Sequence, residues 1–188
     1  MSRPGKEPNC WSHGFTFLEL AITLVIIAAA VTISIPAFSR WLPNYRLRGA
    51  AQDLASNMQL AKMTAISKGT LYTVCFNQPV GSVQYDYVVF EDADSDLEYD
   101  PGEQIILKRR WTEDGYTGVS WDTTKGGGDG ISFTGNDEGR PAVAFRSNGI
   151  PISNSGGMGM GSAYLTGHKQ KRLRVVLSAA GNVAIREY

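Results

Sequence analysis

Two groups of carboxylates in this sequence have residue types and spacing that suit chemistry. The first is Glu19 alone, the single charge in an apolar run over residues 15–39. If that run lies in a bilayer, an unpaired ionised side chain costs roughly 3 kcal/mol on insertion scales. No cationic residue lies within the run. Cleavage of the bond between Gly14 and Phe15 would create a cation, a new α-amino group.

The second group is the acidic segment 92–103. With Asp92 as the first position, its oxygen ligands follow the spacing of an EF-hand calcium loop. Leu97 stands where such a loop has glycine, and the flanking residues predict strands. Two interpretations remain open: a calcium loop between strands and a solvated acidic turn. The calcium ligands would be Asp92, Asp94, Asp96, Glu98, Asp100 and Glu103.

A basic run occupies residues 168–174, where the positive side chains are Lys169, Lys171, Arg172 and Arg174. Such a run can contact the phosphates of a nucleic acid, with salt-dependent binding that does not read sequence. A solvated face of a strand is the alternative. Over the whole chain, 18 Lys and Arg balance 18 Asp and Glu, so net charge gives no reason to seek nucleic acid or an acidic membrane.

Cysteine and histidine are too few for most metal or nucleophilic sites. Two cysteines, Cys10 and Cys75, exclude a disulfide scaffold and a four-thiolate zinc site. His168 has no Ser or Cys nucleophile signature nearby, which argues against a hydrolase triad. We therefore expect no enzymatic activity, and we expect Cys75 to be a small core residue of a strand.

The elements that position these residues begin with the apolar run. As a helix, residues 15–39 would extend about 37 Å, which is enough for a hydrocarbon core of about 30 Å. The run is too long for a secretory signal peptide, and bulky residues follow it where small ones would mark a cleavage site. A plain single-pass anchor would not explain Glu19. We predict one membrane span near the N-terminus.

The remaining chain predicts an α+β fold, in which a long N-terminal helix packs on an antiparallel β-sheet head. The first half of the helix spans the membrane, and the second half, over residues 40–69, is amphipathic. Its apolar stripe, at alternating steps of four and three, is Leu47, Ala51, Leu54, Met58, Ala61 and Ala65. We expect Pro36 and Pro43 to kink or melt the helix locally. From residue 70 to 188, β-branched and aromatic runs predict strands at 71–77, 85–91, 104–111, 142–147, 172–178 and 182–188.

The segment from Gly14 to Leu20, GFTFLEL, resembles the class III signal of type IV pilins and type II secretion pseudopilins. Gly14 matches the residue before the cut, Phe15 the residue after it, Glu19 the fifth mature position and Pro36 the twenty-second. The resemblance implies that a prepilin peptidase removes residues 1–14 as a leader and that Phe15 is N-methylated. It also implies that Glu19 neutralises the amino terminus of a neighbouring subunit during assembly.

The head resembles the GspH/FimT branch of the pilin superfamily. The supporting features are the segment 54–69, the strand that contains Cys75, and a C-terminal hairpin with a glycine turn. The resemblance implies a minor pilin or pseudopilin of the bacterial inner membrane with its head in the periplasm. It would sit near the filament tip, aid initiation of assembly, and have other pilins or pseudopilins, the prepilin peptidase and the inner membrane as partners. No cofactor besides calcium is expected.

Two alternative functions remain open. One is a DNA-binding minor pilin for natural transformation, although the turn at 181–184 lacks both arginines of the family's DNA-binding element. The other is a solitary membrane-anchored binding protein.

Overall fold

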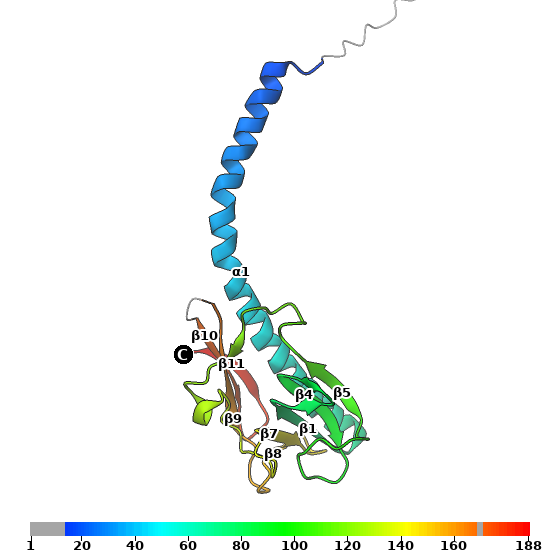
Figure 1. Ribbon diagram of the computed structural model, residues 1–188. Helices are drawn as coiled ribbons and strands as arrows, with labels where there is room; N and C mark the ends of the chain where they lie inside the picture. Colours follow the sequence, from blue (N-terminus) through cyan, green and yellow to red (C-terminus); the bar gives the residue numbers. More distant parts are fainter. Residues whose placement is uncertain (1–13, 169–170) are drawn as a thin grey trace, which may run out of the picture. The chain divides into compact units, whose positions relative to one another are not determined.

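The computed structural model describes residues 14–168 and 171–188, except for the side chains of residues 33, 35–37 and 39–40. The described chain divides into two units between Arg40 and Trp41. One helix, α1 (Phe17–Lys68), contributes to both (Figure 1). The backbone stays helical through Pro36 and Pro43, so the expected melting does not occur.

Within the described residues, no helix combines the length and the hydropathy that crossing a membrane requires. The membrane span expected over residues 15–39 is therefore unconfirmed and stays a prediction.

The amphipathic second half of α1 belongs to the head. All six residues of the predicted stripe are buried, with Leu47 and Ala61 exposed by only 1% and the other four by 0%. The helix ends at Lys68, and Gly69 follows with a φ of +75°, where its N–H bonds to the carbonyl of Ala65 at 2.9 Å. Glycine suits this position because it has no Cβ to oppose a left-handed backbone. The predicted helix seam is confirmed.

The strands form two main antiparallel sheets where a single one was expected. The first has the order β5-β4-β1-β7-β8. Its strands are β1 (Leu71–Phe76), β4 (Tyr87–Asp92), β5 (Ile105–Arg109), β7 (Ala142–Phe145) and β8 (Pro151–Ile152). The second has the order β11-β10-β9-β6. It consists of β6 (Ser120–Trp121), β9 (Gly161–Thr166), β10 (Arg172–Leu177) and β11 (Val183–Glu187).

Smaller elements complete the head. They are the hairpin β2 (Pro79–Val80) with β3 (Val83–Gln84) and the 3₁₀ turn η1 (Gly126–Gly128). The strand β9 was missed because its first two residues lie in the glycine-rich segment 153–162, which predicts a loop. A Cβ on Gly161 would lie 2.6 Å from the ring of Phe133, so this glycine serves a close approach and not a turn.

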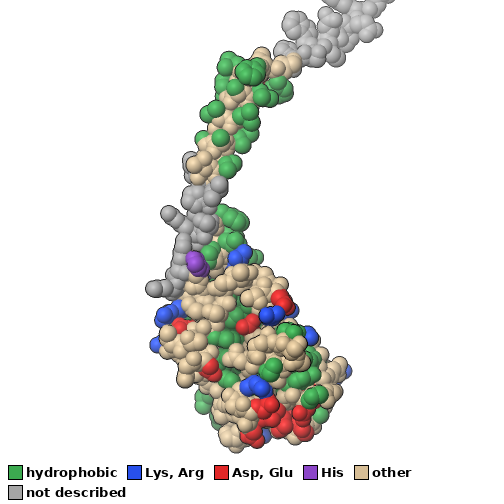
Figure 2. Space-filling model, in the orientation of Figure 1, with side chains coloured by type: hydrophobic (Ala, Val, Ile, Leu, Met, Phe, Trp, Pro, Cys, Tyr) green, Lys and Arg blue, Asp and Glu red, His purple; other side chains and the backbone are tan. Residues whose placement is uncertain are grey.

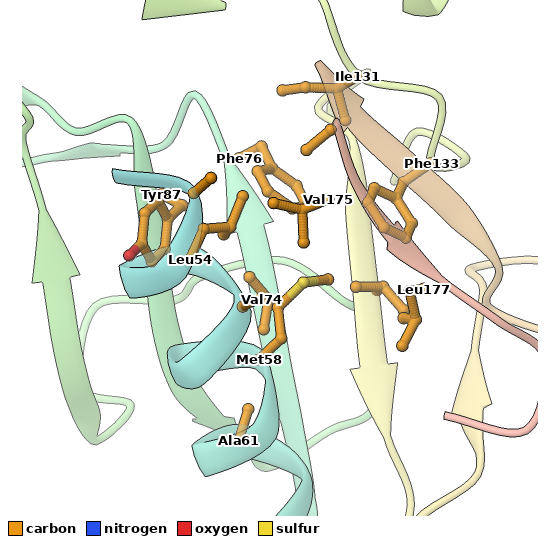
Figure 3. Packing of buried hydrophobic residues seen from close by; sticks show 14 of the residues in the cluster. Leu54, Met58, Ala61, Val74, Phe76, Tyr87, Ile131, Phe133, Val175 and Leu177 are labelled. Carbon is orange, nitrogen blue, oxygen red and sulfur yellow. The ribbon is translucent and has the colours of Figure 1, made fainter. Parts of the chain in front are cut away.

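The α1 helix and the two sheets share one core (Figure 3). Leu54 and Met58 of the helix pack there with Val74 and Phe76 of β1 and Val175 of β10. A smaller cluster covers the opposite face of the first sheet, where Leu97 packs with Cys75, Val88, Phe90, Ala142 and Ala144. The acidic segment 92–103 therefore closes the second face of this sheet through Leu97. The α+β class is confirmed.

Candidate functional site

The residues expected at the processing junction lie at the start of α1. Gly14, Phe15 and Thr16 precede the helix and are exposed. A Cβ on Gly14 would meet no atom within 4 Å, and the residue is not in a left-handed conformation. Neither the local packing nor the backbone of the described chain therefore requires glycine at this position. The rest of the expected leader, residues 1–13, lies outside the described residues.

Glu19 belongs to the first turn of α1, and Thr16 caps that turn. The Glu19 N–H donates to Thr16 Oγ1 at 3.2 Å, and the Leu20 N–H donates to the Thr16 carbonyl at 3.1 Å. Thr16 with Glu19 three residues later is the sequence pattern of a capping box, a local signal that was not predicted. The helix dipole stabilises a carboxylate at this end. Glu19 is exposed and available to a partner.

The first part of α1 exposes apolar side chains in every direction. Consecutive large side chains from Leu24 to Ile27 are all more than half exposed, so they cannot belong to one buried stripe. The exposed large apolar residues of this part are Phe17, Leu18, Leu20, Ile22, Leu24, Val25, Ile26, Ile27 and Val31, and Phe15 just before the helix is also exposed. Pro36, expected to matter for assembly, is helical, but its side chain lies outside the described residues. Further on, exposed Trp41 and Tyr45 stack with ring centroids 5.0 Å apart.

Half of the predicted calcium ligands come together. One carboxylate oxygen from each of Asp92, Asp94 and Asp96 lies within 4.8 Å of the others. Asp92 is buried and already accepts three hydrogen bonds, from the Thr73 hydroxyl at 2.8 Å and from the N–H groups of Ser95 and Leu97 at 2.7 and 3.0 Å. Burial is the main reason that the pKa of Asp92 is raised.

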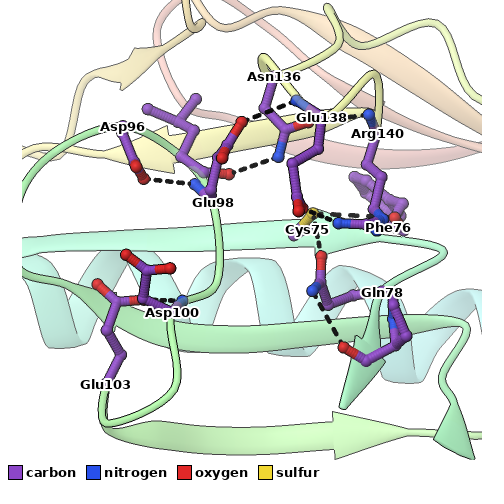
Figure 4. A network of polar contacts seen from close by, with 12 residues as sticks. Cys75, Phe76, Gln78, Asp96, Glu98, Asp100, Glu103, Asn136, Glu138 and Arg140 are labelled. Carbon is purple, nitrogen blue, oxygen red and sulfur yellow. Dashed lines mark hydrogen bonds and ion pairs between the residues drawn. The ribbon is translucent and has the colours of Figure 1, made fainter. Parts of the chain in front are cut away.

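Glu98, Asp100 and Glu103 do not join that cluster. Glu103 accepts from the N–H groups of Ala93 and Asp100 at 2.9 and 3.0 Å, which closes the loop on itself. Glu98 turns towards a second loop and accepts from the N–H of Glu138 at 2.8 Å (Figure 4). Desolvation raises the pKa of both Glu98 and Glu103, with smaller contributions from neighbouring carboxylates.

Leu97 takes the left-handed backbone that an EF-hand gives to glycine. Its φ is +63°, and that of Ser95 is +70°. Burial of the Leu97 side chain, with 2% exposed, holds this conformation. The Asn136 amide also donates to its carbonyl at 3.1 Å (Figure 4). Three carboxylates in this arrangement suit a hard cation, and calcium binding stays a prediction.

The acidic segment makes one end of the head strongly negative. Asp137 and Glu138 are exposed on the loop that Glu98 contacts. Figure 2 shows the Asp and Glu side chains gathered at that end of the head.

The basic run is not a uniform cationic surface. Lys169 lies outside the described residues, and Lys171 is exposed. Arg172 pairs with the buried carboxylate of Asp122 at 3.3 Å. Arg174 is half-buried, and its Nε is a buried atom that has no hydrogen-bond partner in the described chain.

Asp122 is a buried anionic centre that no sequence pattern singled out. It accepts hydrogen bonds from the Thr124 hydroxyl at 2.6 Å and the Tyr188 hydroxyl at 2.8 Å. The Thr124 bond is the main cause that lowers its pKa, and Arg172 contributes. These contacts hold the 122–124 turn against β10 and the end of β11.

A second unpredicted network joins α1 to the first sheet. The Tyr87 hydroxyl donates to Asp53 at 2.7 Å and accepts from the buried Asn57 amide at 2.8 Å. Arg109 lies 3.2 Å from the same Asp53 oxygen. Burial raises the pKa of Tyr87, and the Asp53 charge adds to the effect. The network fixes the helix against β4 and β5.

Cys75 is fully buried, as expected. Its thiol donates to the Gln78 side-chain oxygen at 3.1 Å, and burial raises the pKa of the thiol to about 12 (Figure 4). A thiol in this state is a core group and not a nucleophile.

Comparison with models of protein families shows to which family this helix-and-sheet head is related. Residues 50–181 match the family model described as "Type II transport protein GspH". The chain belongs to the GspH family. Members of this family are structural subunits that assemble into pili or pseudopili at the cell envelope.

A curated relative supports the same relationship for this GspH-family chain. Over 95 residues, this chain is 31% identical to the "Pilin-like protein PilA1" of Thermus thermophilus. The match covers 50% of this chain and 56% of the relative, so the chain spans about half the length of that protein. No solved structure matches the chain significantly.

Proposed function

We propose that this chain is a minor pilin or pseudopilin, a structural subunit of a type II secretion pseudopilus or a type IV pilus. The observation that carries the proposal is the first part of α1, whose apolar side chains are exposed in every direction. Burying an apolar side chain of this size gains about 1.5–3 kcal/mol, so such a helix needs an apolar environment. Packing against the helices of other subunits provides it, and membership of the GspH family supports this partner.

The proposal includes processing at the bond between Gly14 and Phe15. The bond lies in the non-helical residues just before α1, where a peptidase can bind an extended chain. Gly14 is not required by its own surroundings, which favours an external requirement for a small residue. Removal of residues 1–14 by a prepilin peptidase would leave Phe15 as the N-methylated first residue.

Glu19 is proposed to pair with the amino terminus of a neighbouring subunit. The capped first turn of α1 holds Glu19 exposed, one helical turn from Phe15. Between packed apolar helices the pair would be desolvated, and loss of one partner from a buried pair costs roughly 3–5 kcal/mol. Glu19 would therefore set the axial position of each incoming helix.

Before assembly, the proposed place of residues 15–39 is the bacterial inner membrane, with the head in the periplasm. The support is the apolar composition of the segment and the exposed, stacked pair of Trp41 and Tyr45 that follows it. Amphipathic rings favour the membrane–water interface. Pro36 is proposed to adapt the helix during the transfer from lipid to filament.

Within the filament we place this subunit near the tip, where it aids initiation of assembly. The resemblance to the GspH/FimT branch supports that position. DNA binding through Lys169, Lys171, Arg172 and Arg174 is the alternative function. Arg174 forms no ion pair within the described residues, which favours this alternative over a fully neutralised surface. A gel shift at low salt separates the two: failure to retard DNA removes the alternative. A solitary anchored binding protein would instead keep its leader.

The test combines processing with assembly. Mass spectrometry of the chain expressed with its secretion or pilus machinery should show methylated Phe15 as the first residue. Glu19→Gln should be processed normally yet be at least tenfold depleted from sheared filaments, because the amide cannot neutralise an amine. Glu113→Gln, an exposed change in the head, is the matched control. An intact leader, or a Glu19→Gln chain that assembles like the parent, would refute the proposal.

A further inference from the structure

The strand β11 forms an open edge of the second sheet. In the described chain it pairs with β10 alone. The Ser178 N–H donates to the Asn182 carbonyl at 3.0 Å, which makes this pair a hydrogen-bonded one of the ladder. Because such pairs alternate along an antiparallel ladder, Val183, Ile185 and Glu187 turn their N–H and C=O groups away from β10. These groups can accept another strand.

A groove runs beside this edge on the face of the sheet that packs on α1. Its volume is about 240 Å³, and it is lined by Arg48, Gln52, Leu173, Ile185, Arg186 and Glu187. Ile185 faces inward like its cross-strand partner Val175, yet 38% of it is exposed whereas Val175 is fully buried. Ile185, on the edge strand, therefore lacks the apolar cover that Val175 has on the neighbouring strand.

The outer face of the same edge carries unneutralised positive charge. Arg174 and Arg186 are direct cross-strand partners, so their side chains lie on one face of the sheet. Neither forms an ion pair within the described residues, and Arg174 Nε lacks a hydrogen-bond partner. Like charges placed directly opposite each other destabilise a sheet. An anionic group beside Arg186 would remove that repulsion.

We propose that β11 is a docking edge for an extended segment of another protein, in which apolar and acidic residues alternate. Added as a further strand, such a segment would bond to the backbone of Val183, Ile185 and Glu187. Its apolar residues would fill the groove beside Ile185, and its carboxylates would meet Arg186 and Arg174. One partner thus satisfies the backbone edge, the groove and the arginines. The proposal does not require that the chain be a filament subunit.

A second copy of this chain fits the edge less well. If two β11 strands paired about a two-fold axis perpendicular to the sheet, residues opposite each other would lie on the same face of the sheet. Within β11 only Ala184 and Arg186 lie on the face of Arg186, so a second copy would place alanine or arginine opposite it and no carboxylate. Nucleic acid offers phosphates to the arginines but no amide ladder for the backbone of β11. The alternating peptide is the occupant that matches all three features.

The test uses the full chain in detergent and a dye-labelled peptide of about nine residues in which Val and Glu alternate. We expect saturable anisotropy changes, and hydrogen exchange should slow at Val183, Ile185 and Glu187. A peptide with the same composition in two blocks should not bind. N-methylation of the backbone amides on one edge of the alternating peptide should abolish binding, because those N–H groups can no longer donate to β11.

Two charge reversals give the matched comparison. Arg186→Glu should weaken binding about fivefold, whereas Arg146→Glu, on the exposed turn between β7 and β8, should leave it unchanged. Several outcomes would overturn the proposal: no binding of the alternating peptide, equal binding of the N-methylated or block peptide, or protection of amides outside β11. Stronger protection of β11 by a DNA oligonucleotide, or by self-association of the chain, would overturn it as well.

Discussion

The network of Tyr87, Asp53 and Asn57 gives the sharpest prediction for the contact between α1 and the first sheet. In Tyr87→Phe the ring stays, while the hydroxyl that donates to Asp53 at 2.7 Å and accepts from Asn57 at 2.8 Å is removed. A hydrogen bond to a charged acceptor contributes about 1.5–3 kcal/mol, and a buried donor left unsatisfied costs about 1–3 kcal/mol. Asp53 keeps Arg109 nearby and is 17% exposed, so water replaces part of the lost bond.

We therefore expect Tyr87→Phe to lower the free energy of unfolding by about 2 kcal/mol. For a domain of about 150 residues this corresponds to a melting temperature lower by roughly 4–8 °C. The assay is denaturant and thermal unfolding of the full chain in detergent, followed by the fluorescence of the head tryptophans. Trp111 is fully buried in the core and should report the loss of packing.

Tyr85→Phe is the matched control, because Tyr85 is half-buried and has no hydroxyl hydrogen bond in the described structure. Its ring would still lie under the Lys108 ammonium, and we expect a change below about 0.5 kcal/mol. If both variants lose the same stability, the hydroxyl network does not hold the helix to the sheet. A double-mutant cycle with Asp53→Asn should show coupling between the two positions.

Three further predictions concern other parts of the head. Millimolar Ca²⁺ should stabilise the full chain, by roughly 2.7 kcal/mol at a hundredfold excess over Kd. The double substitution Asp94→Asn/Asp96→Asn should abolish the resulting rise in melting temperature. A melting temperature of the parent chain that Ca²⁺ leaves unchanged would refute the calcium hypothesis. The lowered pKa of Asp122 adds stability above its unfolded pKa of about 3.9, and that stability is lost as the pH falls through the folded value. Asp122→Asn should thus destabilise by about 1–3 kcal/mol at neutral pH and by progressively less as the pH falls from about 4 through the lowered folded pKa, whereas equal losses at neutral and low pH would contradict the electrostatic account. In a Cys10→Ser chain, a thiol reagent should label Cys75 only after unfolding, because the thiol is buried and has a pKa of about 12. Rapid labelling of the native chain would mean that the core opens.

The spacing of hydrophobic residues predicted the segments that bury one face against the core. The stripe from Leu47 to Ala65 follows helical spacing because every member faces the same core, and each member is buried. The C-terminal hairpin was also predicted, because Gly181 takes a φ of +74° that the turn requires. Both features depend on residues close in sequence, so local patterns are sufficient to reveal them.

Sequence patterns did not predict the features that depend on contacts between residues far apart in the chain. The strand β9 starts with a glycine because the Phe133 ring occupies the space of a Cβ, and no local pattern contains that contact. The charge on Asp122 likewise becomes buried only when Thr124, Arg172 and Tyr188 converge on it from separate segments. The same limit applies to the acidic loop, where linear spacing proposed six ligands and only three carboxylates meet.

By itself, the sequence determined the order of the chain: an apolar helix start with one acid, an amphipathic helix and a β-rich head. These features are written in composition and in the period of hydrophobic residues, which each segment carries alone. Tertiary structure decided which charges keep a partner, how the strands divide between two sheets, and that β11 has an open edge in the described part of the chain. Such properties depend on which distant groups exclude water from one another, and a linear pattern does not encode that exclusion.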